Sequence, residues 1–153
     1  FTVVTHLRQP IFGTEHNVAI LRDALREEAS VRPFWSDAFV LLPDHLHCVW
    51  TLPEGDDNFS TRWKRIKTRV AKALSGEEER RIWQNRFWEH LVRDETDFAR
   101  HVDYIHYNPV KHGLCATAWE WPHSSFRGYV EQGVYAPDWG GAADSIVLET
   151  AGE

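Results

Sequence analysis

The fold of this chain is organised around residues 42–53, which read LPDHLHCVWTLP. An apolar and aromatic run of this length after a Pro-Asp turn predicts a β-strand. Side chains alternate between the two faces of a strand, so His45 and His47 are expected to share one face. The apolar residues of the opposite face are Leu46, Cys48, Trp50 and Leu52. One face is therefore expected to pack in the core, and the other carries two imidazoles.

Two imidazoles on one face can share a divalent metal ion if a third ligand arrives from elsewhere in the chain. The chain contains 9 His among 153 residues, so the spacing of His45 and His47 alone is not a motif. The alternative is a pair of histidines that face solvent or a neighbouring helix. Residues elsewhere in the sequence must decide between these interpretations.

The pattern of the remaining sequence alternates strands and helices. Further strands are expected at 1–7, 31–42 and 83–92, and helices at 17–29, 60–74 and 94–108. The strand at 31–42 is expected to pair with the histidine strand as an antiparallel hairpin. Ser60 is expected to cap the second helix and Asp94 or Thr96 the third, which Pro109 should end or kink.

Length and composition predict one globular domain. A chain of 153 residues with 42% hydrophobic residues and 8 Trp can bury a substantial core, and its apolar runs are too short to span a bilayer. We expect a single domain at 1–139 and a flexible acidic tail at 140–153. The two cysteines indicate a reducing compartment, which we interpret as the cytoplasm. The short apolar runs predict no association with a membrane. The chain starts at Phe1 inside a predicted strand, and further N-terminal residues are expected to precede it.

The net charge and the distribution of basic residues support opposite expectations about binding to a polyanion. The net charge of −6 argues against binding to a polyanion. Trp63, Ile66, Val70 and Leu74 recur at helical spacing and predict a buried stripe, which leaves the basic side chains of this helix on the solvent side. Those side chains, with no acid among them, are Arg62, Lys64, Arg65, Lys67, Arg69 and Lys72. A solvated helix face and a phosphate-facing helix both remain open.

The helix before Pro109 can complete the histidine site. Its core stripe is expected to consist of Phe98, Val102 and Ile105. At about 100° per residue, Tyr104 and Asn108 then lie one turn apart on one flank, and Tyr107 faces solvent. The Asn108 oxygen would supply a third ligand. A tyrosine beside such a site predicts phosphodiester cleavage, in which Mg²⁺ or Mn²⁺ polarises the phosphoryl group and the phenol attacks phosphorus.

These residues resemble a known family. His45-Leu46-His47 matches the motif of the HUH single-strand endonucleases, and residues 104–111, YIHYNPVK, resemble the signature of their one-tyrosine transposase branch. More narrowly, the sequence resembles the REP-associated tyrosine transposases, bacterial enzymes linked to repetitive extragenic palindromes. The stretches that carry the resemblance lie at 1–12, 42–53, 83–93, 102–113 and 121–126. The resemblance implies an α+β fold, a ferredoxin-like α/β sandwich with helices packed on an antiparallel sheet.

The resemblance also implies residue roles. His45, His47 and Asn108 match the ligands of Mg²⁺ or Mn²⁺, and Tyr104 matches the nucleophile. The enzyme would bind a REP-type hairpin in single-stranded DNA, cleave nearby through a covalent phosphotyrosine, and act as a monomer. The candidates for DNA contact are Arg8, Arg62, Lys64, Arg65, Lys67, Arg69, Lys72 and Arg86.

Two other functions remain open at this stage. A hairpin-DNA binding protein with vestigial catalysis would keep its affinity for the hairpin without Tyr104 and would form no covalent adduct. A metal-dependent hydrolase of small phosphoesters would use Tyr104 only to orient its substrate. The second alternative leaves the basic helix unexplained.

Overall fold

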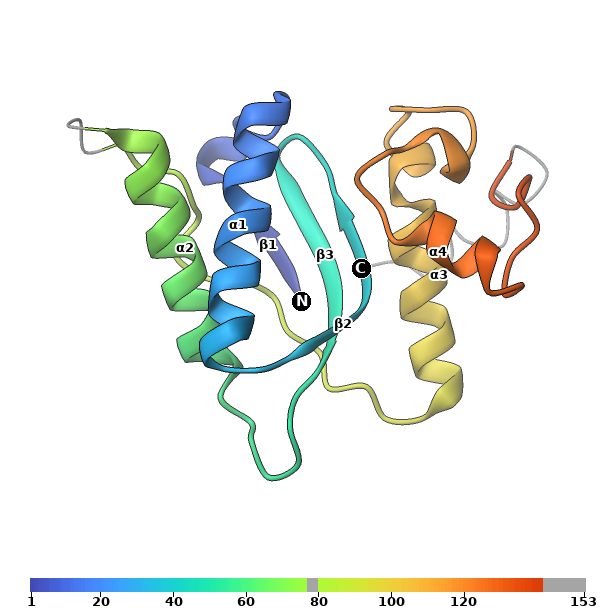
Figure 1. The fold of residues 1–153 in the computed structure, drawn as a ribbon. Coiled ribbons are helices and arrows are strands. Elements are labelled where there is room, and N and C mark those ends of the chain that lie inside the picture. Colours follow the sequence, from blue (N-terminus) through green and yellow to red (C-terminus); the bar gives the residue numbers. More distant parts are fainter. Residues whose placement is uncertain (77–79, 142–153) are drawn as a thin grey trace.

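The chain forms a three-stranded antiparallel sheet between two layers of helices (Figure 1). The structure is a computed structural model that describes residues 1–76 and 80–141. Its elements are β1 (Thr2–Val4), η1 (His6–Arg8), α1 (Glu15–Val31), β2 (Trp35–Leu41), β3 (His45–Thr51), α2 (Phe59–Ser75), α3 (Glu95–Lys111), η2 (Ala118–Glu120) and α4 (Phe126–Glu131). The predicted α+β class with an antiparallel sheet is confirmed.

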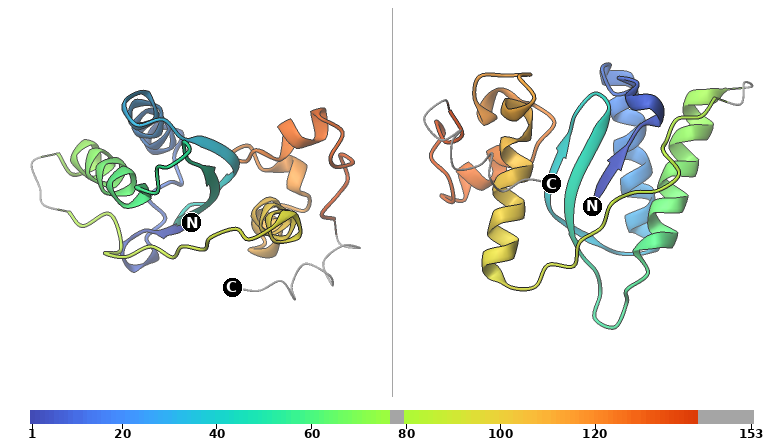
Figure 2. Two further views of the ribbon diagram at one scale, coloured as in Figure 1. Left: turned by 90° about the horizontal axis from the view of Figure 1, so that it is seen from below. Right: turned by 180° about the vertical axis from the view of Figure 1, so that it is seen from behind.

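Different helices cover the two faces of the sheet. Helices α1 and α2 cover one face of the sheet, and α3 with the chain that follows it covers the other (Figure 2). No helix in the described ranges has an apolar stretch of the length needed to cross a bilayer. The predicted tail at 140–153 lies outside the described residues from 142 onward, and the extent of the domain at 1–139 stays a prediction.

Strand β3 occupies the centre of the sheet, in the order β1-β3-β2. His47 lies opposite Thr2 of β1 and Val40 of β2. The predicted hairpin of β2 and β3 is confirmed, with a register shift between Ser36 and Ala38. The histidine strand therefore has neighbours on both sides, which fix the direction of its side chains.

The two faces of β3 enter different cores, as the alternation predicts. Leu46 and Cys48 are buried in the cluster formed with α1 and α2. Val49 packs against the smaller cluster that contains Val102 and Ile105 of α3. His45 and His47 therefore face α3.

The predicted strand at 83–92 is wrong as a regular strand. The segment runs beside β1 and makes only two isolated bridges, Thr5 to Trp83 and Thr2 to Trp88. The two bridges are five residues apart on this segment, from 83 to 88, but only three apart on the N-terminal segment, from 2 to 5. The extra residues interrupt the hydrogen-bond ladder. The segment nevertheless occupies the sheet edge next to β1, where backbone bonds of 2.8 to 3.0 Å hold it.

Helix α3 extends beyond the end that Pro109 predicts. Asp94 caps it by accepting the Asp97 N–H at 2.8 Å, as expected. The proline lies in the last turn, where its missing N–H costs one helical hydrogen bond, and the helix continues to Lys111. It then ends at Gly113, whose φ is +69°, with the Leu114 N–H donating to the Pro109 carbonyl at 2.9 Å. In α2 the cap is Asn58 rather than Ser60.

Tyr107 is buried, and the prediction that it faces solvent is wrong. Its exposed fraction is 3%. The chain after α3 folds back over that side of the helix, and Gly140 comes so close that a Cβ there would lie 3.6 Å from the Tyr107 ring. Helical periodicity cannot predict this, because the covering segment follows the helix in the sequence.

Arg62 is also buried, at 1% exposure, and the expectation that it lies on the solvent side is wrong. Its guanidinium pairs with both oxygens of Asp56 at 3.1 and 2.7 Å and donates to the carbonyls of Arg32, Pro33 and Asn58. Arg62 lies in the first turn of α2, so its side chain reaches back over the helix start. It joins α2 to the connection between α1 and β2.

Replacement of Arg62 tests this structural role. We expect Arg62→Met, which keeps much of the side-chain volume, to lower the free energy of unfolding by about 2 to 3 kcal/mol, because buried carbonyls lose their donor. Lys64→Met on the exposed side of the same helix should change it by less than about 0.5 kcal/mol. Urea unfolding measures both. Equal effects would contradict the buried role of Arg62.

His106 joins α3 to the chain that covers it. Its side chain is fully buried, and its ring nitrogens lie 2.7 Å from the Ser125 hydroxyl and 3.3 Å from the Tyr135 hydroxyl. Burial lowers the pKa of His106 from 6.5 to about 4. The imidazole is therefore neutral in the folded protein at neutral pH.

This shift predicts acid sensitivity. As the pH falls from 6.5 to about 4, the unfolded chain binds a proton at His106 that the folded protein does not, so stability decreases. The loss should reach about 3 kcal/mol near pH 4. In His106→Gln this contribution is absent, and the difference between urea midpoints at pH 7 and pH 4.5 should shrink. An unchanged difference would contradict the assignment.

Candidate metal and tyrosine site

The structure brings Tyr104 and the histidine pair together. The rings of His45 and His47 lie 4.9 Å apart, and the Tyr104 ring lies 5.4 Å from that of His47. Two turns further along α3, the His112 ring lies 5.1 Å from His45. Asn108 lies between Tyr104 and His112 at helical spacing and is therefore bracketed by two contacts to β3.

Asn108 is fully buried, and neither atom of its amide has a hydrogen-bond partner in the described structure. A buried amide without partners costs about 1 to 3 kcal/mol. A metal ion bound at the Asn108 oxygen would remove part of this cost. The donor set of two imidazole nitrogens and one amide oxygen fits a divalent metal ion.

The second nitrogen of each histidine is already occupied. The Thr2 hydroxyl lies 2.7 Å from His47 Nδ1, and an Asp44 carboxylate oxygen lies 2.6 Å from His45 Nδ1. Partners of this kind fix the orientation and tautomer of metal-binding histidines. Nε2 is consequently the nitrogen that each ring has available for a metal ion.

Burial favours the neutral form of two imidazoles at the site, those of His47 and His112. Burial, together with the nearby His45, lowers the pKa of His47 from 6.5 to about 2. Burial also lowers the pKa of His112. Burial opposes ionisation of Asp44, but the interactions with His45 and Arg8 together outweigh it and lower the pKa of that carboxyl. Neutral imidazole is the form that binds metal ions.

Lys111 lies over the tyrosine. Its Nζ is 3.5 Å from the Tyr104 hydroxyl and 4.8 Å from the ring centre. An ammonium at this position supplies positive charge next to the phenolic oxygen. An anionic group such as a phosphate that approached Tyr104 would meet that charge.

The predicted basic residues separate into two groups. Arg8 lies beside the site, 3.4 Å from Asp44, with its side chain 59% exposed. Leu7 and Arg8 both have left-handed backbone conformations, with φ of 53° and 51°, which cost free energy for residues with a Cβ and are typical of functional segments.

The basic residues of α2 lie on the other face of the sheet from the histidines (Figure 1). Lys64 and Lys67 line a groove with Arg80 and Arg81. Arg65 and Arg69 pair with the buried Glu28 at 3.2 and 2.8 Å. The structure therefore does not bring this helix to the histidine face.

Four residues around the site are not predicted from the sequence: Thr2, Asp44, Lys111 and His112. Asp44 precedes His45 directly, which is a signal that could have been used. The position of Thr2 depends on the register of β1 against β3. Lys111 and His112 follow Tyr104 by two helical turns and were missed because Pro109 was expected to end the helix.

The structure thus places a His-Leu-His strand at the centre of an antiparallel sheet and covers it with a helix that carries tyrosine and asparagine one turn apart. No family model matches the sequence. The chain is 45% identical over 142 residues to the REP-associated tyrosine transposase of Escherichia coli K12, covering 92% of this chain and 83% of that protein.

Further comparisons agree. The chain is 41% identical over 155 residues to a putative REP-associated tyrosine transposase of Haemophilus influenzae Rd, covering 94% of this chain and 88% of the relative. A solved structure of a REP-associated tyrosine transposase bound to a REP hairpin matches with a TM-score of 0.83 and 45% identity, over 92% of this chain and 82% of the other. The chain belongs to the REP-associated tyrosine transposases.

Replacement of Asn108 separates stability from metal binding. Without divalent metal, we expect Asn108→Leu to raise the free energy of unfolding by about 1 to 2 kcal/mol, because it removes a buried amide without partners. We expect Mn²⁺ to stabilise the unaltered protein in thermal unfolding and the variant to lose this stabilisation.

Asn108→Asp is the matched control. It keeps an oxygen ligand and should keep the response to Mn²⁺, but it buries a carboxylate and should be less stable without metal. If Asn108→Leu destabilised the metal-free protein as much as Asn108→Asp does, the amide would have a structural role in place of a ligand role.

Proposed function

We propose that this protein binds single-stranded DNA carrying a REP-type hairpin and cleaves and rejoins the strand nearby through Tyr104. The family supports the substrate, since a related transposase is known in a structure bound to a REP hairpin. The observation that carries the chemistry is the contact of the Tyr104 ring with His47 at 5.4 Å beside the unpaired Asn108 amide. Action as a monomer, with Tyr104 acting in cis, rests on the resemblance to the family.

The geometry supports attack by the phenol on a phosphodiester. His45 Nε2, His47 Nε2 and Asn108 Oδ1 would hold Mg²⁺ or Mn²⁺, which when bound polarises a phosphoryl oxygen. Tyr104 Oη gives up its phenolic proton and forms a bond to phosphorus, the bond between phosphorus and the 3′ oxygen breaks, and that oxygen takes up a proton and leaves as a hydroxyl. Lys111, 3.5 Å from Tyr104 Oη, attracts the phosphate. A 3′ hydroxyl reverses the step and joins DNA without an external energy source.

Seven of the eight predicted DNA contacts remain in the proposal. Arg8 is next to the site and would contact the strand close to the scissile phosphate. Basic groups further away would contact other parts of the DNA through its phosphates. These are Lys64, Arg65, Lys67, Arg69, Lys72 and Arg86. Arg62 is not included, because its guanidinium is buried.

Replacement of the tyrosine tests the proposed reaction. With Mg²⁺ or Mn²⁺ and a single-stranded oligonucleotide that carries the repeat hairpin of the source organism, we expect a covalent protein-DNA adduct on a denaturing gel. Tyr104→Phe should abolish the adduct and keep hairpin affinity within a factor of about three, because it removes only the nucleophilic oxygen. His47→Ala should lose the metal-dependent adduct.

Tyr107→Phe is the control for the choice of tyrosine and should form the adduct normally, since Tyr107 is 3% exposed. An adduct that survives in Tyr104→Phe would contradict the proposal. Hairpin binding without an adduct under every metal would favour a binding protein with vestigial catalysis. Turnover of a small phosphodiester without DNA would favour a hydrolase.

A further inference from the structure

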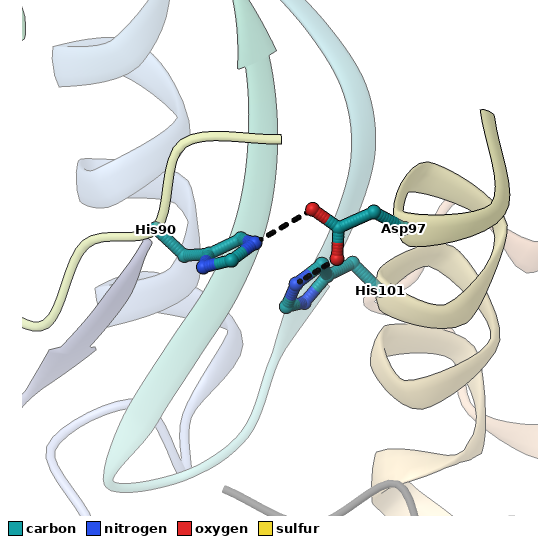
Figure 3. Close-up of side chains that lie close together, drawn as sticks. All are labelled: His90, Asp97 and His101. Carbon is teal, nitrogen blue, oxygen red and sulfur yellow. Dashed lines mark hydrogen bonds and ion pairs between the residues drawn. The ribbon is translucent and has the colours of Figure 1, made fainter. Parts of the chain in front are cut away.

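A second cluster of metal-binding side chains lies where the chain enters α3. His90 comes from the segment that runs along β1, and Asp97 and His101 come from successive turns of α3 (Figure 3). One ligand atom from each of the three residues lies within 4.8 Å of the others. None of the three belongs to the site of Tyr104 and the histidine pair.

The ligand atoms of the three side chains converge on a small volume. His90 Nε2 lies 2.8 Å from Asp97 Oδ2, and His101 Nε2 lies 3.4 Å from Asp97 Oδ1. The two imidazoles therefore point their Nε2 atoms at one carboxylate from two sides, as Figure 3 shows. Around a tetrahedral ion with bonds of about 2.0 to 2.1 Å, the ligand atoms lie about 3.3 Å apart. Small side-chain rotations would bring the three atoms to that spacing.

The carboxylate can accept an ion without losing its structural bonds. Asp97 Oδ2 accepts the backbone N–H of Arg93 at 2.9 Å, a bond that helps to shape the start of α3. The Arg93 side chain is 72% exposed and reaches Oδ2 only at 3.4 Å. In the described structure, the partner of Oδ1 is His101 alone. Oδ1 is thus available to an ion, while Oδ2 keeps its hydrogen bond from the Arg93 backbone N–H.

The protonation states also suit a cation. The hydrogen bond from His90 holds the pKa of Asp97 well below its ordinary value, so the carboxyl is ionised. Burial, with the nearby His90, lowers the pKa of His101, which is therefore neutral at neutral pH. An anionic oxygen and neutral imidazoles are the forms that bind metal ions.

The surroundings hold the ligands in position. The Trp88 ring stacks parallel to His90, with an interplanar angle of 3° and centres 5.8 Å apart. The backbone of Trp88 in turn forms an antiparallel β-bridge with that of Thr2. His90 and His101 are each slightly less than one-third exposed, at 28% and 29%. An ion can therefore enter from solvent, and one coordination position would remain open to water.

We propose that His90, Asp97 and His101 form a second metal site, distinct from the one beside Tyr104, which binds a divalent transition ion of the Zn²⁺ class. Two imidazoles and one carboxylate are a usual ligand set for Zn²⁺ and Co²⁺, whereas Mg²⁺ prefers oxygen ligands alone. The ion would fasten the edge segment to α3, the helix that carries Tyr104. The competing interpretation is a hydrogen-bonded clasp that needs no ion.

The test uses the His47→Ala variant, so that the first site does not contribute. We expect it to bind one Co²⁺ with the visible absorption of a four-coordinate ion, and Zn²⁺ to displace it. Zn²⁺ at 100 times its Kd should raise the ratio of folded to unfolded protein about 100-fold, which thermal unfolding detects. Adding His101→Ala should abolish both responses, and His101→Cys should restore them because the thiolate is again a ligand.

His16→Ala, an exposed histidine of α1, is the matched control and should leave both responses unchanged. Retained Co²⁺ absorption in the His47→Ala and His101→Ala double variant would overturn the proposal. Absence of any Zn²⁺ response in His47→Ala with a normal circular dichroism spectrum would leave the clasp as the explanation and would also overturn it. Neither outcome bears on Tyr104, whose adduct is measured separately.

Discussion

The antiparallel pairing of β3 with strands on both sides is the constraint on which the site depends. Because β1 and β2 fix its register, Leu46 and Cys48 must enter the core beneath α1 and α2. A slip of one residue in this register would exchange the two faces of β3 and bury His45 and His47 among apolar side chains. The same register sets Thr2 opposite His47, so the strand pairing that builds the sheet also orients the imidazole.

Helix α3 brings the remaining groups to this face as a continuous flank. Tyr104, Asn108 and His112 recur every four residues, and the helix must pass Pro109 so that His112, its C-cap, reaches this face. The chain after the helix covers its other side and buries Tyr107 and His106. The helix is thus held between the sheet and its own C-terminal continuation, and the buried Asn108 amide keeps a cost in stability that a metal ion would remove.

The sequence predicts those features that depend on local periodicity. Alternation along 42–53 and the helical spacing of Tyr104 and Asn108 were sufficient to predict the histidine face and the flank of α3. Features that depend on distant segments were not predictable in this way. In the sequence, Arg62 is one of six bases that are expected to face solvent. In the structure, the turn that contains Asp56 folds over it and buries it. The edge segment with Trp83 and Trp88 has the composition of a strand, but its register against β1 breaks between two bridges.

The proposal that β3 and α3 together form one metal site is tested most directly by anomalous scattering from crystals grown with Mn²⁺. The account predicts a peak bounded by His45 Nε2, His47 Nε2 and Asn108 Oδ1, with the Tyr104 hydroxyl beside it. A Mn²⁺ ion bound by the two histidines while the Asn108 amide stays away from it would contradict the account, as would a histidine face that binds no ion at saturating Mn²⁺.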